Sequence, residues 1–139
     1  MEPGQSAPED IVRRCLAAWA ARDVDGTLAC WSPRMRYYTL HAEEGPLAGT
    51  ATGHEELRAR LEGFLGMFDF LAYVVDAVKS EGPVVRTSIV YWYRHKTSRL
   101  ELHGRYRHVW CVEDGFIVTC DEHHDAAALD AFMRLAGST

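Results

Sequence analysis

Three side chains in the C-terminal third of the sequence could carry acid–base chemistry: His108, Glu122 and His124. A carboxylate enclosed by apolar side chains loses hydration, which raises its pKa, and a neighbouring imidazolium lowers it again. A coupled Glu–His pair can therefore hold or release a proton near neutral pH, as a general acid or base must. We hypothesise that Glu122 abstracts or relays a proton next to a carbonyl group. His108 would donate a hydrogen bond to the developing oxyanion, with a tyrosine as a further donor.

These side chains belong to two β-rich runs, 99–112 and 116–124, which are joined by a tight-turn signal at Glu113-Asp114-Gly115. Successive strand side chains point to opposite faces, so alternate residues share a face. One face of the first run carries Leu102, Gly104, Tyr106, His108, Trp110 and Val112. One face of the second run carries Val118, Cys120, Glu122 and His124. If both belong to the same face of the sheet, a large apolar surface surrounds the carboxylate and the imidazoles.

Two other interpretations use the same side chains. A Glu between two His residues also fits a satisfied buried polar network that has no catalytic role. Alternatively, His41, His108, Glu122 and His124 would supply suitable ligands for a metal ion, although nothing in the sequence places the four within bonding distance. We therefore predict a site that uses neither a metal nor a cofactor.

The preceding sequence supplies the helices that must cover this hairpin. Apolar residues at helical spacing predict a first helix to about Arg22 and a later one that starts near Thr52. The first apolar stripe is Ile11, Val12, Cys15, Leu16 and Trp19. The second is Leu57, Leu61, Phe64, Leu65 and Phe68. Between them, Asp23 or Asp25 can cap a short helix that carries Leu28 and Trp31, and Ser32-Pro33 closes it.

Further β-rich runs complete the sheet. We expect strands over 35–41, 70–80 and 84–95, and a loop over 42–51. The last two of these strands and the C-terminal hairpin make a meander of four antiparallel strands. A closing helix, capped by Asp125, carries Leu129, Phe132 and Met133 and ends before Gly137. The economical packing curls the sheet around the three N-terminal helices, which leaves a pocket for a small, largely apolar ligand.

Composition sets the broad class of the protein. With 139 residues, 47% hydrophobic and 25% charged, the chain fits one globular domain over 1–139, with residues 1–5 frayed. A net charge of -5 argues against a nucleic-acid partner. The four cysteines show no metal-finger spacing, and we expect reduced, mostly buried thiols. With no membrane-spanning run and no signal-peptide pattern, a soluble cytoplasmic protein is expected.

The order of these elements resembles the SnoaL-like branch of the NTF2-like superfamily over nearly the whole chain. Three motifs carry the resemblance: the acidic turn Arg22-Asp23-Val24-Asp25, the helix start Gly53-His54-Glu55-Glu56-Leu57, and the turn Glu113-Asp114-Gly115-Phe116-Ile117. The resemblance implies an α+β cone, in which a strongly curved, mostly antiparallel sheet wraps around three N-terminal helices and a short C-terminal helix follows. Members of the superfamily include ketosteroid isomerases, polyketide cyclases, epoxide hydrolases and proteins with no known reaction, so the fold alone does not fix the chemistry.

The resemblance can be carried over residue by residue. The tyrosine and the aspartate base of ketosteroid isomerases fall on Cys15 and Thr39, which cannot do their work, and the oxyanion aspartate falls on His108. Steroid isomerisation by that mechanism is therefore disfavoured. The acidic residue of the cyclase branch falls on Glu122. We expect a pocket lined by Tyr106, Trp110, Cys120, Cys15, Trp19, Thr39, Phe64 and Phe68.

Three functions of different classes follow. The first is a cofactor-independent enzyme of the cyclase or isomerase kind, which acts on an apolar carbonyl compound. The second is a binding module that holds a small apolar molecule without turnover. The third is an assembly domain that forms a homodimer through the outer face of the sheet, bearing either Val90 and Trp92 or Ile89 and Tyr91. Strand parity is ambiguous by one residue at the preceding hairpin, so the sequence does not decide between these two pairs.

Overall fold

The structure, a computed structural model, describes residues 7–40, 49–124 and 126–136. Its first helix, α1 (Pro8–Ala20), starts with a proline, whose missing N–H costs nothing in the first turn. The predicted apolar stripe is confirmed, because Ile11, Val12, Cys15 and Leu16 are buried. The helix therefore lays one face on the core, as its spacing requires.

Helix α2 (Val24–Ala29) is capped by Asp23, whose carboxylate accepts a hydrogen bond of 2.9 Å from the N–H of Gly26. The prediction that Trp31 belongs to this helix is wrong, because strand β1 (Trp31–Leu40) begins at that residue. Leu28 and Trp31 have helical spacing, but Trp31 pairs with Ile117 of the last strand. Pro33, expected to end the helix, lies inside β1 where the pairing register shifts, so its missing N–H removes no regular ladder bond.

Helix α3 (Gly53–Met67) buries Leu57, Leu61 and Phe64, as its apolar stripe predicts. Thr52 occupies the N-cap position, but its side chain makes no capping bond. The carboxylate of Glu56 instead accepts a bond of 3.4 Å from the N–H of Thr52. Phe68, predicted at the end of this helix, is the first residue of the next strand.

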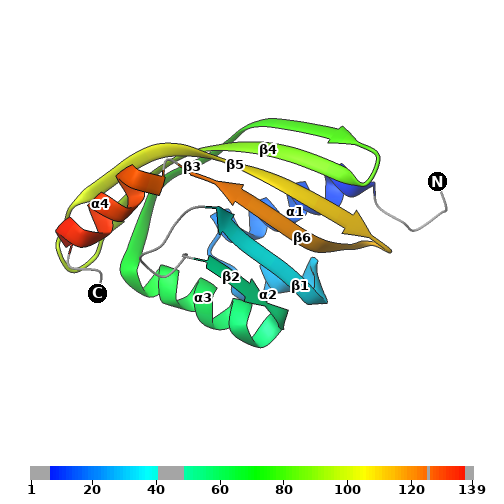
Figure 1. Cartoon of the computed structure of the whole chain (residues 1–139), viewed down its shortest axis with the longest axis horizontal. Helices are drawn as coiled ribbons and strands as arrows, with labels where there is room; N and C mark the ends of the chain where they lie inside the picture. The colour runs from blue at the N-terminus through cyan, green and yellow to red at the C-terminus, as the bar shows by residue number, and fades with distance from the viewer. Residues whose placement is uncertain (1–6, 41–48, 125, 137–139) are drawn as a thin grey trace.

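The strands form one curved six-stranded sheet in the order β2-β1-β6-β5-β4-β3 in the described part of the chain (Figure 1). Their bounds are β2 (Gly49–Thr52), β3 (Phe68–Glu81), β4 (Val84–His95), β5 (Glu101–Glu113) and β6 (Phe116–His123). Strands β3 to β6 make the predicted antiparallel meander, and β1 joins β6 in parallel. Strand β2 falls in the segment predicted as a loop, of which 42–48 lie outside the described residues.

The hairpin between β5 and β6 has the predicted turn. Asp114 and Gly115 form its two-residue loop, with φ angles of 52° and 82°. Two positive φ angles are the signature of the hairpin turn that matches the twist of its strands. Beyond the turn, Val112 pairs with Ile117 and Cys111 with Thr119, so β6 contains one extra residue at Val118.

This bulge changes which side chains face inward. Ile117 is fully buried, whereas Val118, the residue predicted to face inward, is half-buried. After the bulge, Cys120 and Glu122 point to the interior as predicted. The predicted alternation therefore holds at Cys120 and Glu122, and it fails at Ile117 and Val118, next to the turn.

Helices α1, α2 and α3 cover the concave face of the sheet (Figure 1), which confirms the predicted cone. Ile89 and Tyr91 of β4 are 0% and 6% exposed, and Val90 and Trp92 are 37% and 38% exposed. Val90 and Trp92 therefore lie on the outer, convex face. Trp92 stacks there on His103 of β5, with ring centroids 4.7 Å apart.

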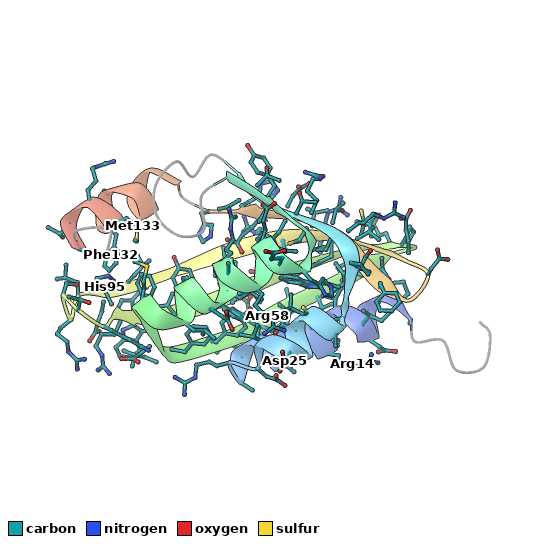
Figure 2. All side chains as sticks on the ribbon, turned by 90° about the horizontal axis from the view of Figure 1, so that it is seen from below. Arg14, Asp25, Arg58, His95, Phe132 and Met133 are labelled. Atoms are coloured by element: carbon teal, nitrogen blue, oxygen red, sulfur yellow. The ribbon has the colours of Figure 1, made fainter. Side chains whose placement is uncertain are left out.

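Helix α4 (Ala126–Ala136) lies at the end of the cone where β4 finishes. Phe132 and Met133 of this helix lie near His95, the last residue of β4 (Figure 2). The Phe132 ring is 6.2 Å from that of Phe68, and Met133 is buried. Asp125, Gly137 and the Leu129 side chain, named in the prediction of this helix, lie outside what the structure describes. None of the described helices is both long enough and apolar enough to span a bilayer.

Candidate active site

A cavity of about 60 Å³ lies between the helices and the concave face of the sheet. Its lining includes all three predicted catalytic residues, His108, Glu122 and His124. The predicted lining residues that the structure places there are Cys15, Trp19, Phe64, Phe68, Tyr106 and Trp110. Cys120 and Thr39 were also predicted to line it; both are buried, but neither is part of its wall.

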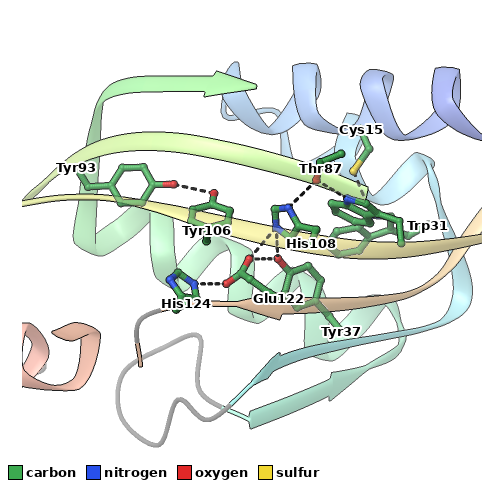
Figure 3. A network of polar contacts seen from close by, with 10 residues as sticks. Cys15, Trp31, Tyr37, Thr87, Tyr93, Tyr106, His108, Glu122 and His124 are labelled. Atoms are coloured by element: carbon green, nitrogen blue, oxygen red, sulfur yellow. Dashed lines mark hydrogen bonds and ion pairs between the residues drawn. The ribbon is translucent and has the colours of Figure 1, made fainter. Parts of the chain in front are cut away.

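The carboxylate of Glu122 is the centre of a buried polar network (Figure 3). Its Oε1 accepts a hydrogen bond from the hydroxyl of Tyr37 and lies 2.9 Å from Nε2 of His108. Its Oε2 lies 2.5 Å from Nε2 of His124. Both imidazoles and the carboxylate are at most 5% exposed at their side chains. The hairpin therefore brings together the three residues that the alternation pattern placed on one face.

A second layer holds His108 in place. Its Nδ1 lies 3.1 Å from the hydroxyl of Thr87 on β4, and that hydroxyl accepts a bond of 2.9 Å from Nε1 of Trp110. An indole nitrogen can only donate, so the Thr87 hydrogen is available to Nδ1 of His108. We assign the proton of the His108 ring to Nε2, where it points at Glu122. Both ring nitrogens of His108 therefore have protein partners.

Burial and the two imidazoles act on Glu122 in opposite directions. Burial by itself raises the pKa of this carboxyl, but the charge of His124 and the hydrogen bonds from His124 and His108 outweigh it. The net effect holds the pKa of Glu122 below its ordinary value. Glu122 is therefore an ionised carboxylate at neutral pH, set in the wall of an apolar cavity.

Tyrosine hydroxyls form another part of the cavity wall. Tyr73, Tyr93 and Tyr106 all line it, and the hydroxyls of Tyr93 and Tyr106 are 3.1 Å apart (Figure 3). Burial is the main cause that raises the pKa of each of these phenols. They remain neutral at physiological pH and can donate hydrogen bonds to a negatively charged oxygen.

Three residues of this site or its support were not predicted from the sequence: Tyr37, Thr87 and Arg60. Tyr37 is two residues before Thr39 on the same strand, so alternation could have found it. Thr87 shares the inner face of β4 with Ile89 and Tyr91. Nothing in the sequence indicates that Arg60, on a helix with many charged residues, is turned toward a cavity.

The metal hypothesis combined His41 with His108, Glu122 and His124. His41 lies outside the described residues. Within the described ranges, no group of three or more His, Cys, Asp or Glu side chains has the arrangement of a metal site. The short distances among His108, Glu122 and His124 are accounted for as hydrogen bonds or ion pairs.

The sequence was compared with models of protein families and with curated proteins. The model of the SnoaL-like domain family matches residues 12–120. A search of curated proteins finds no match.

Solved structures with the same fold share little sequence with this chain. An NTF2-like protein of unknown function from Burkholderia pseudomallei superposes with a TM-score of 0.80 at 23% identity, over 95% of this chain and 98% of the other. TerC, co-crystallised with polyporic acid, gives 0.76 at 18% identity, over 93% and 99%. A hypothetical protein with a ketosteroid isomerase-like fold from Catenulispora acidiphila, in complex with trimethylamine, gives 0.72 at 18% identity, over 86% and 87%. These likenesses concern the fold.

Proposed function

The chain belongs to the SnoaL-like domain family, and on that premise we propose that it is an enzyme that moves a proton next to a carbonyl group of a small, largely apolar molecule. One observation carries the proposal: a buried carboxylate, Glu122, lies in the wall of an apolar cavity between two imidazoles. The NTF2-like superfamily that the chain resembles includes isomerases and cyclases, and proton removal of this kind fits both classes. Neither a metal nor a cofactor is needed for this step.

The hydrogen bonds favour Oε2 of Glu122 as the atom that takes the proton. Oε1 already has two partners, Tyr37 and His108. Among the described residues, Oε2 has one partner, His124, and a carboxylate oxygen can accept a second bond. The C–H electron pair moves to form the enolate double bond, and the carbonyl electron pair moves onto oxygen. A phenol of the tyrosine group can donate to that oxyanion.

The product depends on where the proton or the enolate goes next. Return of the proton from Glu122 to another carbon gives an isomer, and attack of the enolate carbon on a second carbonyl gives a ring. His124, which donates from Nε2 to Oε2, holds that oxygen in position for the transfer. Because both nitrogens of His108 have protein partners, we assign it the role of a positioning residue instead of the oxyanion donor first expected.

The low pKa of Glu122 restricts the substrate. A carboxylate whose pKa is lowered is a weak base, so it cannot efficiently remove a proton from an ordinary ketone. The reacting C–H must be acidified, either by two carbonyl groups or by a carbonyl group and an aromatic ring. The aromatic lining of the cavity favours a compound with an aromatic ring.

A non-catalytic ligand carrier is the competing function. It is favoured by the same hydrogen bonds, because the partners of Glu122 and His108 already satisfy much of the network from within the protein. Exchange of the acidic C–H for deuterium in heavy water, followed by NMR, separates the two functions. An enzyme accelerates the exchange through Glu122, whereas a carrier binds the compound and leaves the exchange rate unchanged.

We also propose that two copies pair through the convex face of the sheet. Leu71, Val74, Val90 and Trp92 are exposed large apolar side chains on β3 and β4. Val74 and Val90 are directly opposite each other across the two strands, so their side chains form one apolar surface. A second copy related by a two-fold axis would cover this surface.

A further inference from the structure

Gly104 lies in the middle of β5, on the concave face of the sheet that also carries Tyr106 and His108. A glycine inside a strand weakens the strand, and it often marks a bulge or a close approach of another group. The pairing of β5 with β4 has no shift in register, so a bulge does not explain this glycine. The residue directly opposite Gly104 on β4 is Tyr91, whose side chain lies on the same face.

The Tyr91 ring occupies the space that a side chain at position 104 would need. A Cβ added to Gly104 would lie 2.7 Å from the hydroxyl oxygen of Tyr91, 3.0 Å from its Cζ and 3.2 Å from its Cε2. The first of these contacts is too short for two groups that are not bonded, so one of them would have to move. The Tyr91 phenol therefore lies directly against the backbone of Gly104, and it can do so because this residue has no side chain.

Tyr91 is part of the cavity wall and lies close to the proposed catalytic groups. It lines the cavity and is 6% exposed. Its ring centroid is 4.5 Å from that of Tyr93, 5.1 Å from that of Tyr106 and 6.4 Å from that of His124. Tyr106 and His124 lie beside Glu122 in Figure 3. The position of the Tyr91 ring therefore determines how much space remains for a ligand next to His124.

A side chain at position 104 would move the Tyr91 ring into that space. Its Cβ would project from the concave face, as the side chains of Tyr106 and His108 do. The strand backbone lies beneath the ring, and the rings of Tyr93 and Tyr106 pack against it. The hydroxyl end of Tyr91 would therefore move away from the sheet, which is toward the ligand.

We propose that Gly104 is a specificity-determining residue: by leaving the Tyr91 ring against the strand, it keeps the space beside His124 open for the aromatic ring of an aryl ketone. This inference rests on the proposed function for the ligand class, and it holds for an enzyme and for a carrier alike. Gly104 does not touch the reacting atoms, so it acts through Tyr91. A larger residue at position 104 should select against ligands that carry a ring.

Two ketones with an acidified C–H test this selection. Phenylacetone has an aromatic ring next to the reacting carbon, whereas acetylacetone has a second carbonyl group and no ring. Calorimetry measures the binding of each compound to the wild-type protein and to Gly104→Ala. We expect Gly104→Ala to weaken the binding of phenylacetone about tenfold, as overpacking of a tight site predicts, and to leave the binding of acetylacetone nearly unchanged.

A double-mutant cycle shows whether the effect passes through Tyr91. Tyr91→Leu removes the ring that a side chain at position 104 would meet, so Gly104→Ala should have no effect on phenylacetone binding in that background. Gly63→Ala is the matched control, because Gly63 is an exposed glycine of α3 where an added Cβ has open space, and it should change neither affinity. If Gly104→Ala alone does not fold, the double variant should fold, because it lacks the steric conflict.

The same loss of phenylacetone affinity in both backgrounds overturns the inference, because the effect would then not depend on Tyr91. An unchanged affinity of Gly104→Ala, an equal loss for both ketones, or no binding of phenylacetone by the wild-type protein also overturns it. If neither Gly104→Ala nor the double variant folds, the glycine has a structural role and the inference fails.

Kinetics of deuterium exchange separate this inference from the proposed function. Because Gly104→Ala obstructs binding and leaves the acid–base groups in place, KM for phenylacetone should rise about tenfold while kcat stays within about twofold. An equal fall in kcat with no change in KM contradicts the inference. If Glu122→Gln exchanges at the wild-type rate, the proposed function fails, and the affinities of Gly104→Ala still decide the role of Gly104.

Discussion

Nε2 of His124 lies 2.5 Å from Oε2 of Glu122, although the two residues are only two positions apart in the chain. In an extended chain, such residues share a face, so a hydrogen bond between them needs no long-range folding event. The contacts from Tyr37 and His108 come from two other strands, β1 and β5. The Glu122 carboxylate therefore bonds both to a residue near it in the sequence and to residues of two distant strands. Its charge should influence the free energy of unfolding as well as proton transfer.

The first prediction concerns the pH dependence of folding. Because the pKa of Glu122 is lower in the folded chain than its ordinary value of 4.5, the ionised carboxylate stabilises the fold above that pH. This contribution is lost as the pH falls below 4.5 through the folded value. Glu122→Gln should therefore cost roughly 1–3 kcal/mol in free energy of unfolding at neutral pH and less in acid. Denaturant unfolding at a series of pH values measures this difference.

The control for that experiment is Asp121→Asn, which removes a carboxylate from the preceding position on β6. Within the described residues, Asp121 makes a long ion pair with Arg36, at 4.0 Å, on the partly exposed side of the strand. A difference between wild type and Glu122→Gln that stays constant from neutral to acid pH would contradict the assigned ionisation of Glu122.

The second prediction concerns Tyr37. Tyr37→Phe removes the hydroxyl that donates to Oε1 of Glu122 and should cost about 1–2 kcal/mol of stability. It should also slow deuterium exchange of the substrate, with a smaller effect on binding, because the carboxylate loses one of its orienting partners. Tyr38→Phe is the matched control, since the next residue of β1 points to the other face. Identical behaviour of the two variants would remove Tyr37 from the site.

The third prediction concerns the layer behind His108. Thr87→Val keeps the side-chain shape but removes the hydroxyl that connects Trp110 to His108. We expect kcat to fall while KM changes little, because Thr87 does not line the cavity. Thr87→Ser retains the hydroxyl and should restore most of the rate. If Ser and Val give the same rate, packing and not the hydrogen bond explains the role of Thr87.

The fourth prediction concerns assembly. The proposed two-fold pairing predicts a particle of twice the chain mass in light scattering or sedimentation. The double variant Val74→Lys and Val90→Lys places charges on the exposed apolar surface and should give a monomer. Phe116→Lys, at an exposed apolar residue beside the hairpin turn, should leave the mass unchanged. A monomeric wild-type protein would contradict the pairing.

Much of the sheet could be predicted from sequence because its signals are local. The strand predicted over 84–95 has the bounds of β4 in the structure, and the turn at Asp114 and Gly115 lies where the sequence indicates. Alternation is also a local rule, and it placed Glu122, His108 and His124 together. The resemblance to the NTF2-like superfamily predicted the cone, and within a cone the face that carries Glu122, His108 and His124 points inward.

The failures have a different cause, which is pairing between distant segments. Trp31 has the spacing of a helical residue after Leu28. It is nevertheless the first residue of β1, because it pairs with Ile117 of β6. The bulge at Val118 depends on the register with β5, which no pattern within β6 reveals. Alternation with Thr39 places Tyr37 on the inner face, but its partnership with Glu122 exists only once β1 pairs with β6 in parallel.

The most direct measurement of the central claim is deuterium exchange at the benzylic carbon of phenylacetone, whose C–H lies between a carbonyl group and an aromatic ring, in heavy water, compared between wild type and Glu122→Gln. The wild-type protein should accelerate exchange above the buffer rate and hold that rate from neutral pH to below 4.5, because Glu122 stays ionised there. Glu122→Gln should lose this acceleration while it still binds the compound, and Asp121→Asn should keep it. Equal rates for wild type and Glu122→Gln would contradict the account, since proton transfer would then not depend on this carboxylate.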